Sequence, residues 1–214
     1  MIIAVDGPTA SGKGTIAKAL ARHFHLPHMD TGLLYRAVGY QVSLNGGNPD
    51  DPAEALGACE FPDELLGHPD LRSEATGGLA SRVSVHPAVR QALHQRQRAF
   101  ATQAGGAVLD GRDIGTVIAP DADVKLFITA SVAARAQRRW KEMQARGESH
   151  TLLEIEDDLR RRDERDRTRK EAPLVAAADA LALDTSALDR DQAVAAAIAL
   201  AEQALSPRGT SGQR

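Results

Sequence analysis

Short apolar runs alternate along the chain with longer segments of helical periodicity. The apolar runs are three to five residues long and are typical of buried strands at residues 2–5, 27–29, 107–109, 124–128 and 180–183. Near-continuous apolar strands with helices between them indicate a parallel sheet covered on both faces. The pattern therefore predicts an α/β fold, with a five-stranded parallel sheet flanked by helices.

Helical patterns fill most of the chain outside these strands, over residues 16–22, 87–103, 133–146, 154–171 and 192–205. Pro173 marks the end of the charged pattern at 154–171. Residues 45–70 are rich in Gly, Pro and Asp and show no clean period, so we expect an irregular insert or a mobile flap there. Residues 206–214 are polar and contain Gly and Pro, so we expect a disordered tail.

Length and charge narrow the class of protein. The 214 residues suffice for one sizeable α/β domain with an inserted segment or two. The 26 basic and 29 acidic residues give a formal net charge of −3, which argues against a general nucleic-acid surface. A single cysteine, Cys59, fits a reducing compartment. We see no signal peptide and no membrane span, and we expect a cytoplasmic monomer.

A glycine-rich segment joins the first apolar run to the first helical pattern. Strand, glycine loop and helix in this order form a phosphate cradle, because glycines let backbone N–H groups point inward at the helix N-terminus. Lys13 supplies a positive charge for the β- and γ-phosphates of a nucleoside triphosphate. The alternative is a glycine-rich surface turn with a solvated lysine. The predicted cradle comprises Gly7, Pro8, Thr9, Ala10, Ser11, Gly12, Lys13, Gly14 and Thr15.

The loop departs from the usual phosphate-binding sequence directly after its lysine. Gly14 stands where many such loops have a hydroxyl that binds Mg²⁺, and the hydroxyl comes one residue later as Thr15. Asp110 follows the third apolar run, a usual place for a carboxylate that orients Mg²⁺ or its waters. The alternative is an Asp-Gly turn in which Arg112 and Asp113 form a local pair.

A hydroxyl, a glycine and an arginine follow the second apolar run. In the segment Asp30-Thr31-Gly32-Leu33-Leu34-Tyr35-Arg36, the Thr31 hydroxyl and a helix N-terminus can donate to a phosphate that Arg36 also binds. The alternative is a capped helix start, with Asp30 or Thr31 as the N-cap residue.

Two further groups of arginines lie on helical patterns. Arg135 and Arg139 share a helix face, from which they can stack on a purine and reach its phosphates. A second face carries three guanidiniums and a carboxylate that can surround a migrating phosphoryl group, at Arg162, Arg165, Asp166 and Arg169. The alternative for both groups is an exposed helix face whose charges are solvated or paired with one another.

Four separated motifs together resemble the bacterial cytidylate kinases. They are Gly-Pro-Thr-Ala-Ser-Gly-Lys-Gly-Thr at 7–15, Met-Asp-Thr-Gly-Leu-Leu-Tyr-Arg at 29–36, Asp-Gly-Arg-Asp-Ile-Gly-Thr-Val at 110–117, and Arg-Arg-Asp-Glu-Arg-Asp-Arg-Thr-Arg at 161–169, followed by Ala172-Pro173-Leu174. The match covers most of residues 1–205. It implies transfer of the γ-phosphoryl group of ATP to CMP or dCMP, with Mg²⁺ bound alongside ATP, largely through phosphates and water.

Carried over residue by residue, the resemblance implies roles on the acceptor side. Thr31 and Arg36 contact the monophosphate, Asp166 binds the sugar and Arg169 the acceptor nucleotide. The cytosine edge is read by Ser81, Arg90 and Asp113. Arg112 and Arg162 bind phosphate, so the implied catalytic set is Lys13, Arg112, Arg162 and Arg169, while Arg135 and Arg139 are grouped with the ATP site.

The resemblance also implies how the chain is divided. We expect one P-loop NTPase domain over residues 1–205, with its core in segments 1–36, 84–150 and 172–205. An acceptor-side insert covers about 37–83 and an arginine-rich lid about 147–171. The 44 residues between Arg36 and Ser81 are fewer than in the fuller insert of such kinases and lack a strand-rich stretch.

Two other functions remain open at this point. The first is a P-loop kinase for another small acceptor, such as UMP, AMP or a shikimate-like alcohol. The second is a GTP-binding switch that acts through partners, although the chain lacks an Asn-Lys-x-Asp guanine-reading motif and carries a second cluster of anion-binding candidates.

Overall fold

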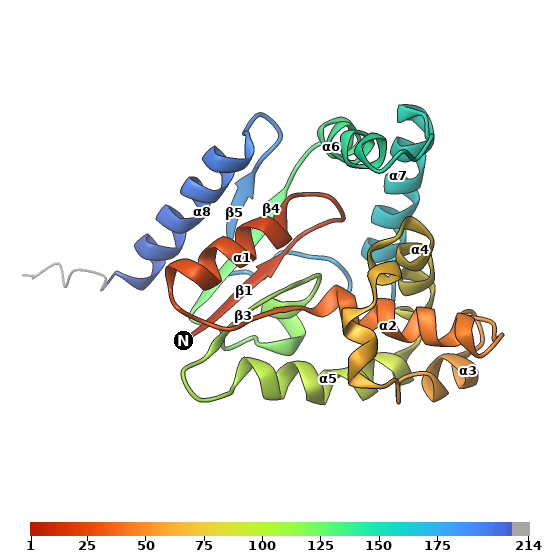
Figure 1. The fold of residues 1–214 in the computed structure, drawn as a ribbon. Coiled ribbons are helices and arrows are strands. Elements are labelled where there is room, and N and C mark those ends of the chain that lie inside the picture. The colour runs from red at the N-terminus through yellow and green to blue at the C-terminus, as the bar shows by residue number, and fades with distance from the viewer. Residues whose placement is uncertain (207–214) are drawn as a thin grey trace, which may run out of the picture.

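Five parallel strands form the single sheet of the structure, a computed structural model that describes residues 1–206. The strands run in the order β2-β3-β1-β4-β5, so the first strand lies at the centre (Figure 1). Their bounds are Ile2–Asp6, His28–Asp30, Ala107–Gly111, Val124–Thr129 and Leu181–Asp184 for β1 to β5. The predicted five-stranded parallel sheet is confirmed, and every strand lies within two residues of its expected position at either end.

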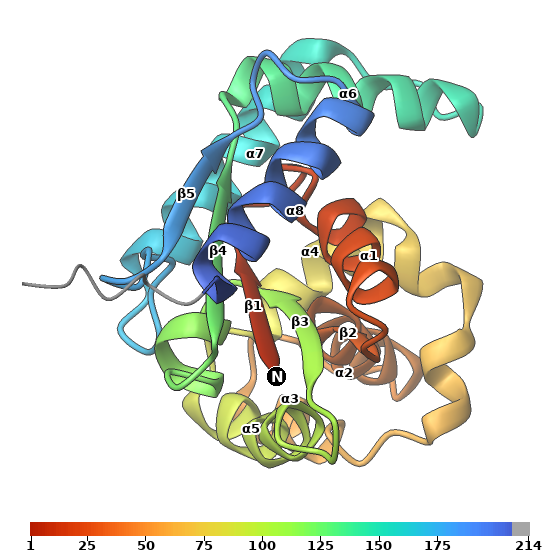
Figure 2. The same ribbon diagram turned by 90° about the vertical axis from the view of Figure 1, so that its left-hand side faces the viewer.

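Helices cover both faces of this sheet, as Figure 2 shows from the side. Helices α1 (Lys13–His23) and α8 (Arg190–Leu205) pack on one face, where Ile3 and Val5 of β1 join their apolar cluster. Ala4 points to the other face, which is covered by α5 (Pro87–Ala101) and a short π-helical turn, η3 (Ile114–Ile118). Successive residues of β1 are thus buried on opposite faces, which explains why the strand is apolar throughout.

The remaining long helices lie beyond the carboxyl ends of the strands. They are α2 (Thr31–Leu44), α6 (Val132–Ala145) and α7 (Leu152–Thr168), and α6 and α7 pack against each other. Helix α7 begins with a capping box, in which the Thr151 and Glu154 side chains bond to each other's backbone N–H groups. The helical patterns at 133–146 and 154–171 are confirmed, although α7 ends at Thr168.

Residues 45–83 contain more structure than their sequence indicates. They form α3 (Pro52–Gly57), two 3₁₀ helices, η1 (Asp63–Gly67) and η2 (Pro69–Arg72), and α4 (Glu74–Val83). The expectation of a mobile flap at 45–70 is corrected, because Ala55, Phe61, Leu65 and Leu71 are buried in a cluster with α2 and α5. The apolar residues lie on several short helices rather than on one long helix, so the sequence of this segment shows no single period.

Two expectations concern the limits of the chain. The predicted tail at 206–214 lies outside the described residues, apart from Ser206, which follows the end of α8. Among residues 1–206, no helix is both long and apolar enough to cross a membrane.

Cys59 is a free, half-buried thiol whose pKa is raised to about 11 by burial, which agrees with its interpretation as a small apolar residue.

Candidate active site

The glycine loop turns directly from β1 into α1 and is fixed by close backbone contacts. Gly7 has a φ of 153°, and a Cβ at this position would lie 2.1 Å from the carbonyl oxygen of Ile128, so a side chain has no room. Gly12 adopts the left-handed conformation at the N-cap of α1. The Thr185 hydroxyl, which follows β5, donates to the Ser11 carbonyl at 3.0 Å. The loop therefore presents the N-terminus of α1 in a fixed position, as the predicted phosphate cradle requires.

Lys13 is the cation at the centre of this loop. Its Nζ donates to the Pro8 carbonyl at 3.2 Å. Burial lowers the pKa of Lys13 to about 8, and the nearby Arg112 charge acts in the same direction. Asp110 and Asp30 oppose this shift, so the lysine is predominantly protonated at neutral pH. A buried lysine with a second cation close by is suited to bind a multiply charged anion.

A cavity of about 580 Å³ lies over the loop. This volume is in the range of ordinary small-molecule sites, which is roughly 300–1,000 Å³. The cavity is lined by loop residues 10–15, by Asp30 at the end of β2, and by residues of α6, the β5–α8 connection and η2, including Arg138, Arg139 and Arg72. Six residues of the predicted cradle thus line one cavity, and Arg139 reaches it as expected.

Arg135 does not line this cavity, although it was grouped with Arg139. Its buried guanidinium donates to Asp163 of α7, to the Ala130 carbonyl and to the Thr9 carbonyl of the loop. The structure therefore makes Arg135 a brace between the loop and α7. Arg138, which the sequence analysis did not select, lines the cavity instead and donates to the hydroxyl and carbonyl of Thr185.

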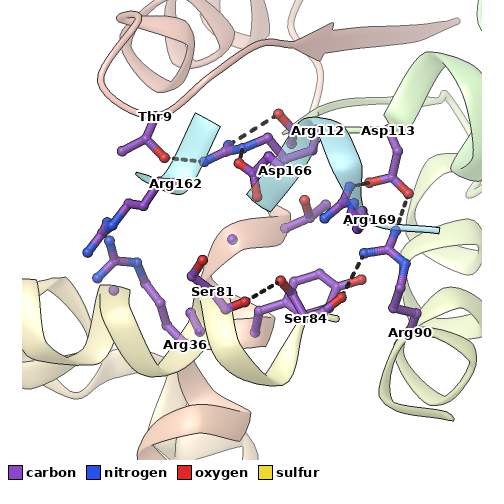
Figure 3. A pocket seen from close by; sticks show the side chains of 16 residues that line it. Thr9, Arg36, Ser81, Ser84, Arg90, Arg112, Asp113, Arg162, Asp166 and Arg169 are labelled. Atoms are coloured by element: carbon purple, nitrogen blue, oxygen red, sulfur yellow. Dashed lines mark hydrogen bonds and ion pairs between the residues drawn. The ribbon is translucent and has the colours of Figure 1, made fainter. Parts of the chain in front are cut away.

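A second cavity lies on the other side of the loop, between α2, α4, α5, β3 and α7 (Figure 3). It contains every residue predicted for the acceptor side, namely Thr31, Arg36, Ser81, Arg90, Arg112, Asp113, Arg162, Asp166 and Arg169. The alternative of an exposed, salt-bridged helix is wrong for the inner face of α7, because Arg162 and Asp166 are 6% and 7% exposed. Arg160 and Arg167 on the outer face do form such exposed pairs.

Ion pairs between its own side chains close much of the second cavity. Arg112 donates to Asp166 at 2.7 Å, and Arg90 pairs with Asp113. The space left is about 100 Å³, which is below the usual size of a ligand site. Arg112 and Asp113 do not pair with each other, so the alternative of a turn with a local Arg–Asp pair is wrong. A ligand entering this cavity must exchange its own polar groups for these pairs.

One donor in this cavity has no hydrogen-bond partner within the described residues. The Nη2 group of Arg169 is buried, and the nearest carboxylate oxygen, of Asp113, is 3.6 Å away. Arg169 directly follows α7, and burial together with the neighbouring Arg90 charge lowers its pKa. A buried guanidinium with an unused donor costs free energy unless a ligand accepts from it, so this group marks a binding position.

Glu74, at the start of α4, connects the two sides of the site. Its carboxylate pairs with Arg139 of α6 and with Arg162 of α7, the latter at 2.5 Å. Burial and the Arg162 charge lower the pKa of Arg139 to about 10, and the same two causes lower the pKa of Arg36 to about 10. Three arginines, Arg36, Arg139 and Arg162, are therefore close together here, and the Glu74 carboxylate is shared between two of them. Arg165 adds a further link by donating to Ser81.

Asp110 lies at the base of the glycine loop with its carboxylate held in place. His28 Nε2 is 2.7 Å from Asp110 Oδ1, and Asp110 Oδ2 is 3.7 Å from the position of a Cβ on Gly14. Burial and the Asp110 charge raise the pKa of neighbouring Asp30. Asp30 is the N-cap residue of α2 but makes no capping bond with its side chain, and Thr31 donates to the Asp110 carbonyl at 2.8 Å. Neither side chain is used as an ordinary helix cap.

Asp6 is a structural residue of the site that sequence reasoning missed. Asp6 is the last residue of β1 and follows an apolar run, as Asp110 does in β3. The rule that selected Asp110, a carboxylate directly after an apolar run, would therefore have selected Asp6 as well. Its carboxylate accepts from the backbone N–H groups of Ile114 and Gly115, both at 2.8 Å. These bonds fix the turn that follows Asp113. Glu74 and Arg72 were also missed, because they lie in or beside the segment without a clear period.

The sheet order, the glycine loop and the cationic second cavity together define a kinase of the P-loop NTPase class. A family model described as "Cytidylate kinase" matches residues 3–203. The chain therefore belongs to the cytidylate kinase family and is a nucleoside monophosphate kinase. This confirms the resemblance seen in the four sequence motifs.

Curated relatives support the same assignment. A cytidylate kinase of a Caulobacter species is 53% identical over 204 residues, which cover 95% of this chain and 94% of the relative. The cytidylate kinase of Afipia carboxidovorans is 51% identical and is covered over 100% of its length, with 97% of this chain aligned. Among solved structures, an uncharacterized protein from Eubacterium ventriosum has a TM-score of 0.54 at 15% identity, covering 95% of this chain and 98% of its own, which supports the fold alone.

We expect Asp6→Ala to destabilise the protein by at least about 2 kcal/mol, because it leaves two buried N–H groups without an acceptor. Chemical denaturation followed by circular dichroism measures the change. Asp123→Ala is the matched control, since Asp123 also accepts a backbone N–H, from Ile2, but at an exposed position. Equal losses of stability for the two variants would contradict the role assigned to Asp6.

Proposed function

We propose that this protein transfers the γ-phosphoryl group of ATP to CMP and dCMP, giving CDP and dCDP. One observation carries the proposal. Arg36, Arg112 and Arg162, from three separate parts of the chain, line one cavity whose wall is the glycine loop itself, at Thr9. The other side of the same loop lines the larger cavity, from Ala10 onward. Two anion sites that share a thin backbone wall suit a donor triphosphate and an acceptor phosphate.

The paired side chains Arg90 and Asp113 suit recognition of cytosine. A carboxylate accepts from the exocyclic amine of cytosine, and a guanidinium donates to its ring acceptors. In the structure the two groups satisfy each other, and Asp113 is held by the turn that Asp6 fixes. When cytosine binds, its edge can replace this ion pair, and both side chains keep hydrogen-bond partners. Adenine has a different pattern of donors and acceptors, so some of these groups would be left without a partner. We assign Ser81 to the same base edge, Asp166 to the sugar and Arg169 to the acceptor nucleotide.

The proposed chemistry is a direct in-line transfer without a covalent enzyme intermediate. Phosphoryl transfer requires alignment and charge neutralisation rather than a protein nucleophile. Lys13, Arg112, Arg162 and Arg169 surround the transferred group in this proposal, and Thr31 and Arg36 hold the acceptor phosphate. We assign Arg139 to the donor side. Its guanidinium and that of Arg162 are close enough for the Glu74 carboxylate to pair with both. The residues around α7 exclude water, which would otherwise accept the phosphoryl group.

The residues at the base of the loop fit Mg²⁺ bound with ATP. Asp110 has one carboxylate oxygen held by His28 and the other facing the loop at Gly14, and Asp30 is close by. Mg²⁺ is commonly held by one or two carboxylates together with substrate phosphates and waters. Bound there, the ion would neutralise charge that develops on the donor phosphates. Asp110 would orient the ion or its waters, and His28 would keep the carboxylate in one rotamer.

A coupled assay of ADP formation with different acceptors tests the function. We expect ATP-dependent turnover with CMP and dCMP to exceed turnover with UMP, AMP or shikimate by at least about tenfold, which is the discrimination expected from one unsatisfied base contact. Higher turnover with another acceptor would replace CMP in the proposal. Tight GTP binding without acceptor-dependent turnover would indicate a switch protein instead. The cytoplasmic location and the monomeric state stay predictions, and sedimentation analysis tests the latter.

We expect Asp113→Ala to raise the KM for CMP by about 10- to 100-fold, because the variant loses a charged hydrogen bond to the base. The KM for ATP changes little, since Asp113 lines only the acceptor cavity. Steady-state kinetics with each substrate varied in turn separates the two effects. Asp157→Ala, which removes an exposed carboxylate of α7, is the control. Unchanged CMP kinetics in Asp113→Ala would remove this residue from the acceptor site.

The lowered pKa of Lys13 predicts how activity depends on pH. In the free enzyme the charged lysine is lost as the pH rises through about 8, so kcat/KM for ATP should fall about tenfold per pH unit above that value. Bound triphosphate favours the charged form and raises the pKa, so the fall in kcat begins at higher pH. Initial rates between pH 6 and 10 measure both profiles. A kcat/KM that stays constant to pH 9.5 would contradict this role for Lys13.

A further inference from the structure

We propose that Arg72 is an additional catalytic residue, which binds the transferred phosphoryl group from the side of residues 45–83. The inference rests on the proposed kinase function but not on the identity of the acceptor. Arg72 is the last residue of η2 and belongs to none of the four motifs that revealed the family. As a sequence position it is an ordinary charged residue in an irregular segment.

The side chain of Arg72 lies where the two substrate sides meet. It lines the large cavity over the glycine loop, together with Lys13, Asp30 and Arg139. It also lines a smaller cavity with Asp30, Arg139 and Arg36. Arg36 also lines the acceptor cavity and Arg139 the cavity over the glycine loop, so the smaller cavity borders both. The transferred group must pass between these two sites.

The backbone on both sides of Arg72 is held by an acceptor-side arginine. Arg36 Nη1 donates to the Leu71 carbonyl at 2.7 Å and to the Ser73 carbonyl at 2.9 Å. The Leu71 side chain is fully buried, and Ser73 caps α4 by accepting from Thr76 N–H. An exposed arginine on a loop is normally free to move with its backbone. Here the neighbouring peptide groups are held in place, so binding of an anion orders only the side chain and not the backbone as well.

The charge of Arg72 is not neutralised within the described residues, where no carboxylate lies within ion-pair distance of it. Arg139 and Arg162 share Glu74, and Arg112 has Asp166. Arg72 instead adds to the positive field and contributes to the lowered pKa of Arg36, after burial and the charges of Arg162 and Arg112. A cation placed close to other cations without a counter-ion is a mark of a site for a polyanionic ligand.

The proposed step can be written with its bonds. An oxygen of the acceptor monophosphate forms a bond to the γ-phosphorus as the bond from that phosphorus to the β–γ bridging oxygen breaks. The electron pair of the broken bond stays on ADP, and the acceptor oxyanion needs no proton removed. Arg72 donates hydrogen bonds to the equatorial oxygens of the group in transit, which carry the negative charge in the transition state.

The test compares Arg72→Gln with Arg72→Lys in full-length enzyme. We expect Arg72→Gln to lower kcat by about 10- to 100-fold, a range typical of losing one donor to a transition-state charge. The affinity for CMP alone, measured by calorimetry, should stay within about twofold, because Arg72 does not line the acceptor cavity. Arg72→Lys retains the charge and should recover part of kcat. Arg96→Gln is the control, since Arg96 is an exposed arginine paired with Asp63 near the same segment.

Each outcome supports or overturns the catalytic role of Arg72. A kcat for Arg72→Gln within about twofold of wild type overturns the proposal. So does a loss of kcat that Arg72→Lys shares in full and that comes with a lowered melting temperature, because a structural role would produce that result. If wild-type enzyme prefers another acceptor, the CMP assignment fails, but the same comparison runs with that acceptor and still tests Arg72.

Discussion

The close packing of positive charge is the constraint on which the rest of the site depends. Guanidinium groups from α2, from the turn after β3, from α6 and from α7 line the cavities on either side of the glycine loop, and burial lowers the pKa of Lys13 in that loop. In the absence of substrate, carboxylates hold these groups in place: Asp166 on Arg112, Asp113 on Arg90, and Glu74 on both Arg139 and Arg162. Each carboxylate stabilises an arrangement that would otherwise be opened by mutual repulsion.

The scaffold provides the rigidity that this arrangement needs. Gly7 contacts the backbone of β4, Thr185 donates to the glycine loop from the end of β5, and Asp6 holds the turn after β3. All three contacts occur at the carboxyl edge of the same parallel sheet, where ligands of such folds bind. The sheet therefore positions both the glycine loop and the turn that follows Asp113.

Sequence reasoning succeeded where one local pattern carries the information. The apolar strands, the spacing from Gly7 to Lys13 and the inner face of α7 each follow from a short period or a fixed motif, and the structure confirms them. It failed at Arg135, which has the same helical spacing as Arg139 but faces Asp163 and the loop backbone. It also missed Glu74 and Arg72, since residues 45–83 are folded by burial of scattered apolar side chains, and no period shows which polar groups point toward the site.

In the proposed function, the distribution of ion pairs separates binding of the acceptor from transfer of the phosphoryl group. On the proposed acceptor side, contacts to the ligand would replace the Arg90–Asp113 and Arg112–Asp166 pairs, so binding would exchange interactions rather than add them. The small cavity that borders both sides has an excess of positive charge, because its lining includes four arginines and two carboxylates, those of Asp30 and Glu142. In the proposed reaction, a multiply charged group in transit lies close to Arg72, whereas a monophosphate bound in the acceptor cavity does not contact Arg72, because Arg72 does not line that cavity. Catalysis requires that difference, since only interactions that strengthen in the transition state raise kcat.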